Sequence, residues 1–160
     1  MKKKWVAFCL AASMLGAGTV FAKPAPAQLV PEKHGQCYTA EDLFVKDVNG
    51  AGGGMGVLHG EFAFRREQAL GSDAIKEIGW MTLKKGASIG LHPHADNDDT
   101  YIIISGKGVF TGSDGKEIAV GPESVTIAGP GESHALRNDG DEDLVFIDVI
   151  AKNVPKAEKK

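Results

Sequence analysis

The chain contains little cysteine: only Cys9 and Cys37 occur among its 160 residues, too few for a disulfide scaffold. It also lacks an uninterrupted apolar run of about 20 residues, the length that a membrane-spanning helix requires. No stretch keeps the 3.6-residue apolar period long enough to predict a helix. A chain of this length buries roughly two thirds of its unfolded surface in one core. We therefore expect a single domain that folds without disulfides.

The first 22 residues have the composition of a secretory signal peptide. Three lysines precede a mostly apolar stretch that is interrupted by Gly16 and Gly18 and ends in Val20, Phe21 and Ala22. We predict cleavage after Ala22, because an uncleaved membrane anchor, the alternative, needs a longer continuous apolar run. No pair of arginines precedes this stretch, so the general export route fits better than the twin-arginine route. These features predict a periplasmic or secreted protein.

Cleavage would change both the net charge and the cysteine content. It removes three lysines and no acid, so the formal net charge falls from −3 to −6. An acidic protein is a poor partner for nucleic acid or an anionic membrane, and we expect neither nucleic-acid binding nor stable membrane insertion of the mature chain. Cys37 would remain alone in an oxidising compartment, either as a buried inert thiol or in an intermolecular disulfide.

The mature chain divides into a leader, a β domain and a tail. Residues 23–40 are predicted to be an extended leader, because residues 23–35 carry three prolines and little apolar pattern. Residues 41–151 form the predicted β domain, and residues 152–160 a charged C-terminal tail. The stretch 49–56, NGAGGGMG, is too rich in glycine for a helix and lacks the Gly-Lys-Ser/Thr of a phosphate loop. We predict a flexible connection there.

Short strands fill most of the β domain. The polar stretches 112–117 and 138–143 are predicted hairpin turns, with Gly115 and Gly140 at positive φ. Regularly spaced strands joined by such turns predict an all-β, antiparallel sandwich or barrel. The strand that begins near Asp99 is apolar on both faces, so we expect another sheet or a partner subunit to cover its outer face. The expected strands lie within residues 61–67, 77–86, 100–110, 116–131, 133–138 and 143–151.

Two of the five histidines stand one residue apart in the stretch GLHPHADNDDTYIIISGKG. Residues two apart on a strand point to the same face, so the side chains of His92 and His94 should converge. Asp99 follows after a tight turn, and His134 lies on a separate predicted strand. Three imidazoles and one carboxylate suit a divalent transition metal and leave positions open for water or a substrate. A metal site is therefore predicted from His92, His94, Asp99 and His134.

The spacing of these residues resembles the cupin superfamily, in particular small single-domain bacterial cupins of type 2. The first cupin motif, G-x5-H-x-H-x4-E-x6-G, is matched by Gly86, His92, His94, Asp99 and Gly106, with aspartate in place of glutamate. The second, G-x5-P-x-G-x2-H-x3-N, is matched by Gly131, His134 and Asn138. It departs at Glu123, which replaces glycine, and at Gly129, which replaces proline.

The resemblance implies a single antiparallel β-barrel of the jelly-roll type, a double-stranded β-helix, with a metal at its mouth. His92, His94 and His134 would be ligands, and the protein would be a homodimer. Aspartate is shorter than glutamate by about 1.5 Å, one carbon–carbon bond, so Asp99 either ligates directly or holds a metal-bound water. Asp96 and Asp98 are weaker candidates.

The predicted function is that of an exported metal-binding cupin acting on a small oxygen-rich molecule through one divalent metal ion. Mn or Zn is favoured for a protein that folds after export, and Fe, Ni or Cu are alternatives. The pattern favours an enzyme, as a decarboxylase, lyase, isomerase or dioxygenase, with a non-catalytic binding module as the alternative. Tyr101 shares the face of Asp99 and either orients a substrate, donates a proton or packs in the core.

Three further polar residues are candidates for roles around the site. Asp148 interrupts an apolar strand, where a buried carboxylate would need a partner and could be an acid of raised pKa. A salt bridge or a place at the edge of the barrel is the preferred alternative. Glu132 is predicted to be a loop acid and Arg137 to face away from His134.

Overall fold

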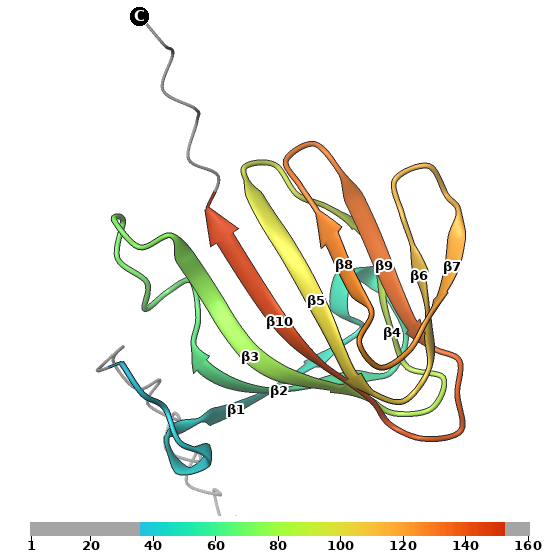
Figure 1. Cartoon of the computed structure of the whole chain (residues 1–160), viewed down its shortest axis with the longest axis horizontal. Helices are drawn as coiled ribbons and strands as arrows, with labels where there is room; N and C mark the ends of the chain where they lie inside the picture. The colour runs from blue at the N-terminus through green and yellow to red at the C-terminus, as the bar shows by residue number, and fades with distance from the viewer. Residues whose placement is uncertain (1–35, 153–160) are drawn as a thin grey trace, which may run out of the picture.

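The computed structural model describes residues 36–152. The predicted signal peptide, residues 23–35 of the leader and residues 153–160 lie outside the described residues. Ten strands and two short 3-10 turns make up the described part (Figure 1). The turns are η1 (Ala40–Asp42) and η2 (Ala51–Gly53), and the strands are β1 (Phe44–Asn49), β2 (Val57–Phe64), β3 (Ile75–Leu83), β4 (Ser88–Pro93), β5 (Asn97–Ser105), β6 (Gly108–Thr111), β7 (Glu117–Val120), β8 (Val125–Ala128), β9 (Ser133–Asn138) and β10 (Leu144–Lys152).

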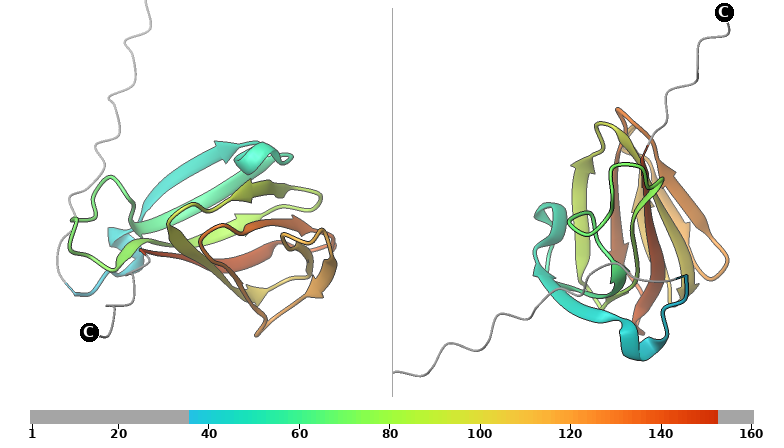
Figure 2. Two further views of the ribbon diagram at one scale, coloured as in Figure 1. Left: turned by 90° about the horizontal axis from the view of Figure 1, so that it is seen from above. Right: turned by 90° about the vertical axis from the view of Figure 1, so that its left-hand side faces the viewer.

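The strands form two antiparallel sheets. One has six strands in the order β1-β2-β3-β10-β5-β8, and the other has four in the order β4-β9-β6-β7. The side views show the sheets as two layers (Figure 2). Their inner faces supply one core, in which Phe62, Met81 and Phe146 of the larger sheet pack with Ile89 and Leu136 of the smaller.

The predicted all-β, antiparallel jelly roll is confirmed. The two sheets pack face to face rather than closing into one continuous hydrogen-bonded barrel. Alternation places Asp99, Tyr101 and Ile103 of β5 inside and leaves Ile104 on the outer face 41% exposed. No helix in the described part of the chain is long and apolar enough to cross a bilayer.

Some local predictions were wrong. Gly115 has the expected positive φ of 75°, but Gly140 does not belong to the glycines with positive φ. The side chain of Asn138 holds that turn instead, since its Oδ1 accepts a hydrogen bond from the N–H of Gly140 at 3.0 Å. Cys37 is exposed, so the expected buried thiol was wrong.

The glycine-rich stretch between β1 and β2 is a tightly packed loop that lies on β4. Met55 and Ser88 exchange hydrogen bonds, with the N–H of Ser88 donating to the Met55 carbonyl at 2.8 Å and the N–H of Met55 donating to Ser88 Oγ at 2.9 Å. A Cβ on Gly52 would lie 2.9 Å from the Gly90 carbonyl oxygen and 3.1 Å from Nδ1 of His92. Glycine therefore permits the close approach of this loop to β4.

Candidate metal centre

A β-bulge in β4 turns His92 inward. The register between β4 and β9 pairs Ile89 with Leu136 and His92 with His134, and it shifts between these two pairs. The extra residue lets both Ile89 and His92, three positions apart, face the interior, which strict alternation would forbid. The sequence predicted the convergence of His92 and His94 but carried no signal for the bulge.

The other three residues come from neighbouring parts of the two sheets. His94 directly follows β4, His134 lies on β9 opposite His92, and Asp99 lies on β5 of the larger sheet. His94, Asp99 and His134 are buried, whereas His92 is partly exposed. The centre thus spans the gap between the sheets and is closed on all but the His92 side.

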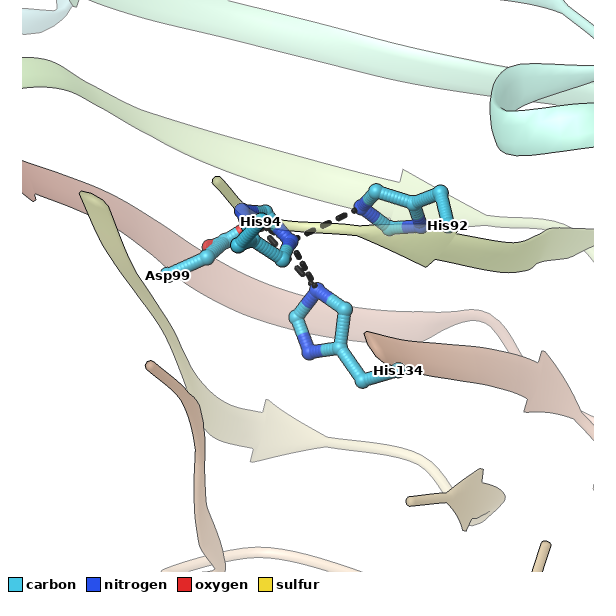
Figure 3. Close-up of side chains that lie close together, drawn as sticks. All are labelled: His92, His94, Asp99 and His134. Atoms are coloured by element: carbon cyan, nitrogen blue, oxygen red, sulfur yellow. Dashed lines mark hydrogen bonds and ion pairs between the residues drawn. The ribbon is translucent and has the colours of Figure 1, made fainter. Parts of the chain in front are cut away.

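The four side chains direct one atom each toward a common point (Figure 3). Nε2 of His94 lies 3.2 Å from Nε2 of His92 and 3.0 Å from Nε2 of His134. Oδ2 of Asp99 lies 3.4 Å from Nε2 of His94 and 3.3 Å from Nε2 of His134. One ligand atom from each residue lies within 4.8 Å of every other.

The far side of each imidazole is held in a different way. Nδ1 of His92 donates to the carbonyl of Gly90 at 2.9 Å, which leaves the lone pair on Nε2 facing the centre. Nδ1 of His134 is buried without a hydrogen-bond partner. Its ring is fixed by stacking on Tyr101, with ring centroids 4.6 Å apart and planes inclined by 21°.

The surroundings favour neutral imidazole and ionised carboxylate. Burial lowers the pKa of His94, outweighing the attraction of Asp99 for its charged form. Burial pushes the pKa of Asp99 upward, but hydrogen bonds from His134 and Asp148 outweigh it and the net shift is downward. These are the protonation states that metal ligands need.

The donor set fits a divalent metal ion. Ligand atoms at about 2.1 Å from one ion are about 3.0 Å apart at right angles and about 3.4 Å apart at tetrahedral angles. Four of the six separations among the ligand atoms, 3.0 to 3.4 Å, span this range, and the other two, from His92 to His134 and to Asp99, are at most 4.8 Å. In addition, lone pairs that point at one another repel unless a proton or cation lies between them. The four residues could therefore hold a metal ion, whose identity the donor set does not fix.

The other polar residues singled out in the sequence do not belong to the group of four ligands. Asp96 is exposed, and neither it nor Asp98 belongs to the converging group. Glu132 is exposed and accepts a hydrogen bond from the N–H of Gly129, and Arg137 pairs with Glu117 at 3.3 Å. The preferred expectation for Asp148 was wrong, since it lies on a central strand and forms no salt bridge among the described residues. It matches the alternative of a buried acid, because burial raises its pKa well above the usual value.

Tyr101 lies beside the centre rather than open to it. Only 2% of the residue is exposed, and its ring lies between those of His134 and Phe146, with centroids 4.6 and 4.8 Å away. Burial, followed by the charges of Asp99 and Asp148, raises its pKa well above the usual value. A tyrosine in this setting keeps its proton, so it cannot act as a base at neutral pH.

Comparison with known proteins connects this geometry with cupins. Residues 79–150 match the cupin domain family. The oxalate-binding protein of Thermotoga maritima is 29% identical over 119 residues, covering 74% of this chain and 96% of that protein. A crystal structure of a predicted oxalate decarboxylase from Thermotoga maritima matches with a TM-score of 0.66 and 27% identity, covering 74% of this chain and 100% of that one.

A structure of an uncharacterised protein from Klebsiella pneumoniae, described as having a double-stranded β-helix domain, has a TM-score of 0.55 and 20% identity. The match covers 74% of this chain and 91% of that one, and this likeness concerns the fold alone.

Proposed function

We propose that this chain is an exported cupin that holds one divalent metal ion with His92, His94, Asp99 and His134 and binds a small carboxylate at it. The convergence of three imidazole nitrogens and one carboxylate oxygen within 4.8 Å carries the proposal. A bound divalent ion would act as a Lewis acid toward the oxygens of such a ligand. Mn and Zn are the first candidates for a protein that takes its metal after export.

Oxalate is the first ligand to test. The relatives named for oxalate support it, and so does the partial exposure of His92, which leaves the centre open on one side. A compact dianion can approach a metal through two oxygens at once. Because His94, Asp99 and His134 are buried and only His92 is partly exposed, we expect oxalate to bind more tightly than longer dicarboxylates such as succinate.

The test is metal content and oxalate affinity in the wild type and in the double variant His92→Ala/His94→Ala. Protein purified from its exported location should contain about one equivalent of Mn or Zn and should bind oxalate by calorimetry. The double variant should lose both. Wild-type protein that takes up no metal from an excess of Mn or Zn would refute the proposal, and iron at full occupancy would overturn our choice of metal.

The second candidate function is turnover of the same ligand, as a decarboxylase. The position of Tyr101 against both Asp99 and His134 favours it, because a retained proton lies next to the centre. Carbon-13-labelled oxalate followed by NMR distinguishes the two functions through the appearance of formate. If Tyr101 takes part in turnover, Tyr101→Phe should lower kcat while oxalate binding stays within a factor of about three.

We also propose that the protein is a homodimer through the outer face of β3, β10, β5 and β8. The middle of this face is apolar, with Lys76 and Asp98 as charged residues near its ends, and Trp80, Val125 and Ile127 on it are 43%, 57% and 61% exposed. A groove of about 990 Å³ between Trp80 and the segment 36–43 extends the apolar surface. Sedimentation analysis should show a dimer for the wild type and a monomer for Ile127→Lys, whereas a monomeric wild type would refute the assignment.

A further inference from the structure

His94 lies just beyond the last residue of β4, and the pairing of β4 with β9 does not include it. Its backbone is bonded to the turn that precedes β9 instead. The N–H of His94 donates to the Glu132 carbonyl at 2.8 Å, and the N–H of Gly131 donates to the His94 carbonyl at 2.7 Å. The backbone of His94 therefore keeps its place only while residues 131 and 132 keep theirs.

The same turn leads directly to a second residue of the centre. His134 follows two residues after Glu132, on β9. The Nε2 atoms of His94 and His134 lie 3.0 Å apart (Figure 3). A movement of the turn would shift His94 relative to His134, so the shape of the turn is part of the geometry of the centre.

Residues 129–132 form a type II turn. The N–H of Glu132 donates to the Gly129 carbonyl at 3.0 Å, and Gly131, at the third position, has a φ of 85°. Pro130, at the second position, has a φ that its ring fixes. Gly129, at the first position, has no such restriction, because glycine has more backbone freedom than any other residue. The first position is thus the flexible one.

The side chain of Glu132 restrains this flexible position. Its Oε2 accepts a hydrogen bond from the N–H of Gly129 at 2.7 Å. The two ends of the turn are therefore joined twice, once through the backbone and once through a carboxylate, which is a strong acceptor. The second cupin motif has proline at position 129, and proline has a fixed φ and no N–H to donate. Glycine at this position supplies the donor that Glu132 uses.

We propose that Glu132 is a positioning residue, which holds His94 at the metal centre by fastening the turn 129–132. This inference rests on the metal centre proposed above. Glu132 lies outside the group of four ligands, so it acts on His94 through the backbone of the turn. A ligand that is already in place loses less freedom when the metal binds, and the metal is then held more tightly.

The experiment compares Glu132→Ala with Glu132→Gln. Glutamine keeps a side-chain oxygen that can accept from the N–H of Gly129, whereas alanine has no acceptor. Both variants remove the same negative charge. Asp96→Ala is the matched control, because Asp96 is an exposed acid two residues after His94 that also lies outside the group of four ligands. The measurements are the dissociation constant for Mn(II) by chelator competition, the EPR spectrum of bound Mn(II), and the Tm of metal-free protein.

We expect Glu132→Ala to bind Mn(II) about 5- to 10-fold more weakly, the effect of losing one hydrogen bond that orders the site, with a changed EPR line shape. Glu132→Gln and Asp96→Ala should bind within about twofold of the wild type and keep its spectrum. A purely structural role would lower the metal-free Tm of Glu132→Ala and leave its affinity and EPR spectrum unchanged, which would overturn the inference.

The inference is also overturned if Glu132→Gln or Asp96→Ala weakens binding as much as Glu132→Ala, since the lost charge would then explain the effect. Should the alanine variant fail to fold, Glu132→Leu, which also lacks an acceptor, is judged by the same criteria. Wild-type metal binding is measured first, so the two proposals fail separately. A wild type without metal affinity refutes the proposed function, whereas equal affinity in the wild type and Glu132→Ala refutes only the role of Glu132.

Discussion

Replacing Glu123 by glycine should stabilise the protein. Glu123 is the only non-glycine residue with positive φ in the described part of the chain, at 70°. It is the third residue of a turn from Gly121 to Ser124, which is closed by a hydrogen bond from the N–H of Ser124 to the Gly121 carbonyl at 3.0 Å. Proline before a residue of positive φ makes this a type II turn, in which the third position favours glycine.

The size of the effect follows from two opposing terms. A side chain in the left-handed region costs about 1–2 kcal/mol, which the variant recovers. Glycine makes the unfolded chain more flexible, and this costs about 0.5–1 kcal/mol. The net gain is therefore about 0.5–1 kcal/mol, or roughly 2–5 °C in Tm for a domain of this size. Glu123 is exposed, so no buried contact is lost.

The assay is equilibrium unfolding in urea and by heat, with Glu123→Ala as the control. Alanine removes the carboxylate but keeps the Cβ, so it should gain nothing from the backbone. The m value should stay constant across the three proteins, which shows that only stability has changed. A glycine variant no more stable than the alanine variant would refute the strain that we assign to this turn.

Two further variants test other parts of the structure. Gly52→Ala and Gly53→Ala should each lower the free energy of unfolding by about 1–2 kcal/mol, since both residues have positive φ, at 57° and 81°. Only Gly52→Ala should also weaken metal binding. Its Cβ would press on His92, whereas nothing lies within 4 Å of a Cβ on Gly53. Equal metal affinity in the two variants would show that the packing of this loop on His92 does not affect metal binding. Burial raises the pKa of Glu77 above its usual value despite the charge of Arg65. The contribution of Glu77 to stability is therefore fully present below about pH 4.5, the pKa of glutamate in the unfolded chain. This contribution is lost as the pH rises through the pKa of Glu77 in the folded protein. Urea unfolding from pH 4 to 7 should therefore show the wild type losing stability relative to Glu77→Gln, and parallel curves would contradict the shift.

Periodicity in the sequence was sufficient to predict much of the fold. The segment 133–138 coincides with β9, and the alternation in 99–105 correctly placed Asp99 and Tyr101 on the inner face. These predictions succeeded because a strand with one buried face imposes a two-residue period on its side chains. The approach of His92, His94 and His134 to one another followed from the same rule and from the cupin spacing.

The features that the sequence did not reveal depend on contacts between distant segments. The bulge near Gly90 depends on how β4 pairs with β9, and the packing of Gly52 on β4 depends on a loop almost 40 residues earlier in the chain. Likewise, Asp148 looked like a candidate for a salt bridge, because a single strand cannot show which residue of its neighbour lies diagonally opposite. Only the register of β10 against β5 places Asp148 opposite Tyr101 and diagonal to Asp99.

β4 is an edge strand of the smaller sheet, and the loop that contains η2 lies along its free side. An open edge offers unpaired backbone groups to any other chain and invites polymerisation. The loop occupies those groups through Met55 and Ser88, immediately beside a ligand of the centre. A protease cut within this loop would thus expose the edge of β4, so cleavage should be followed by aggregation.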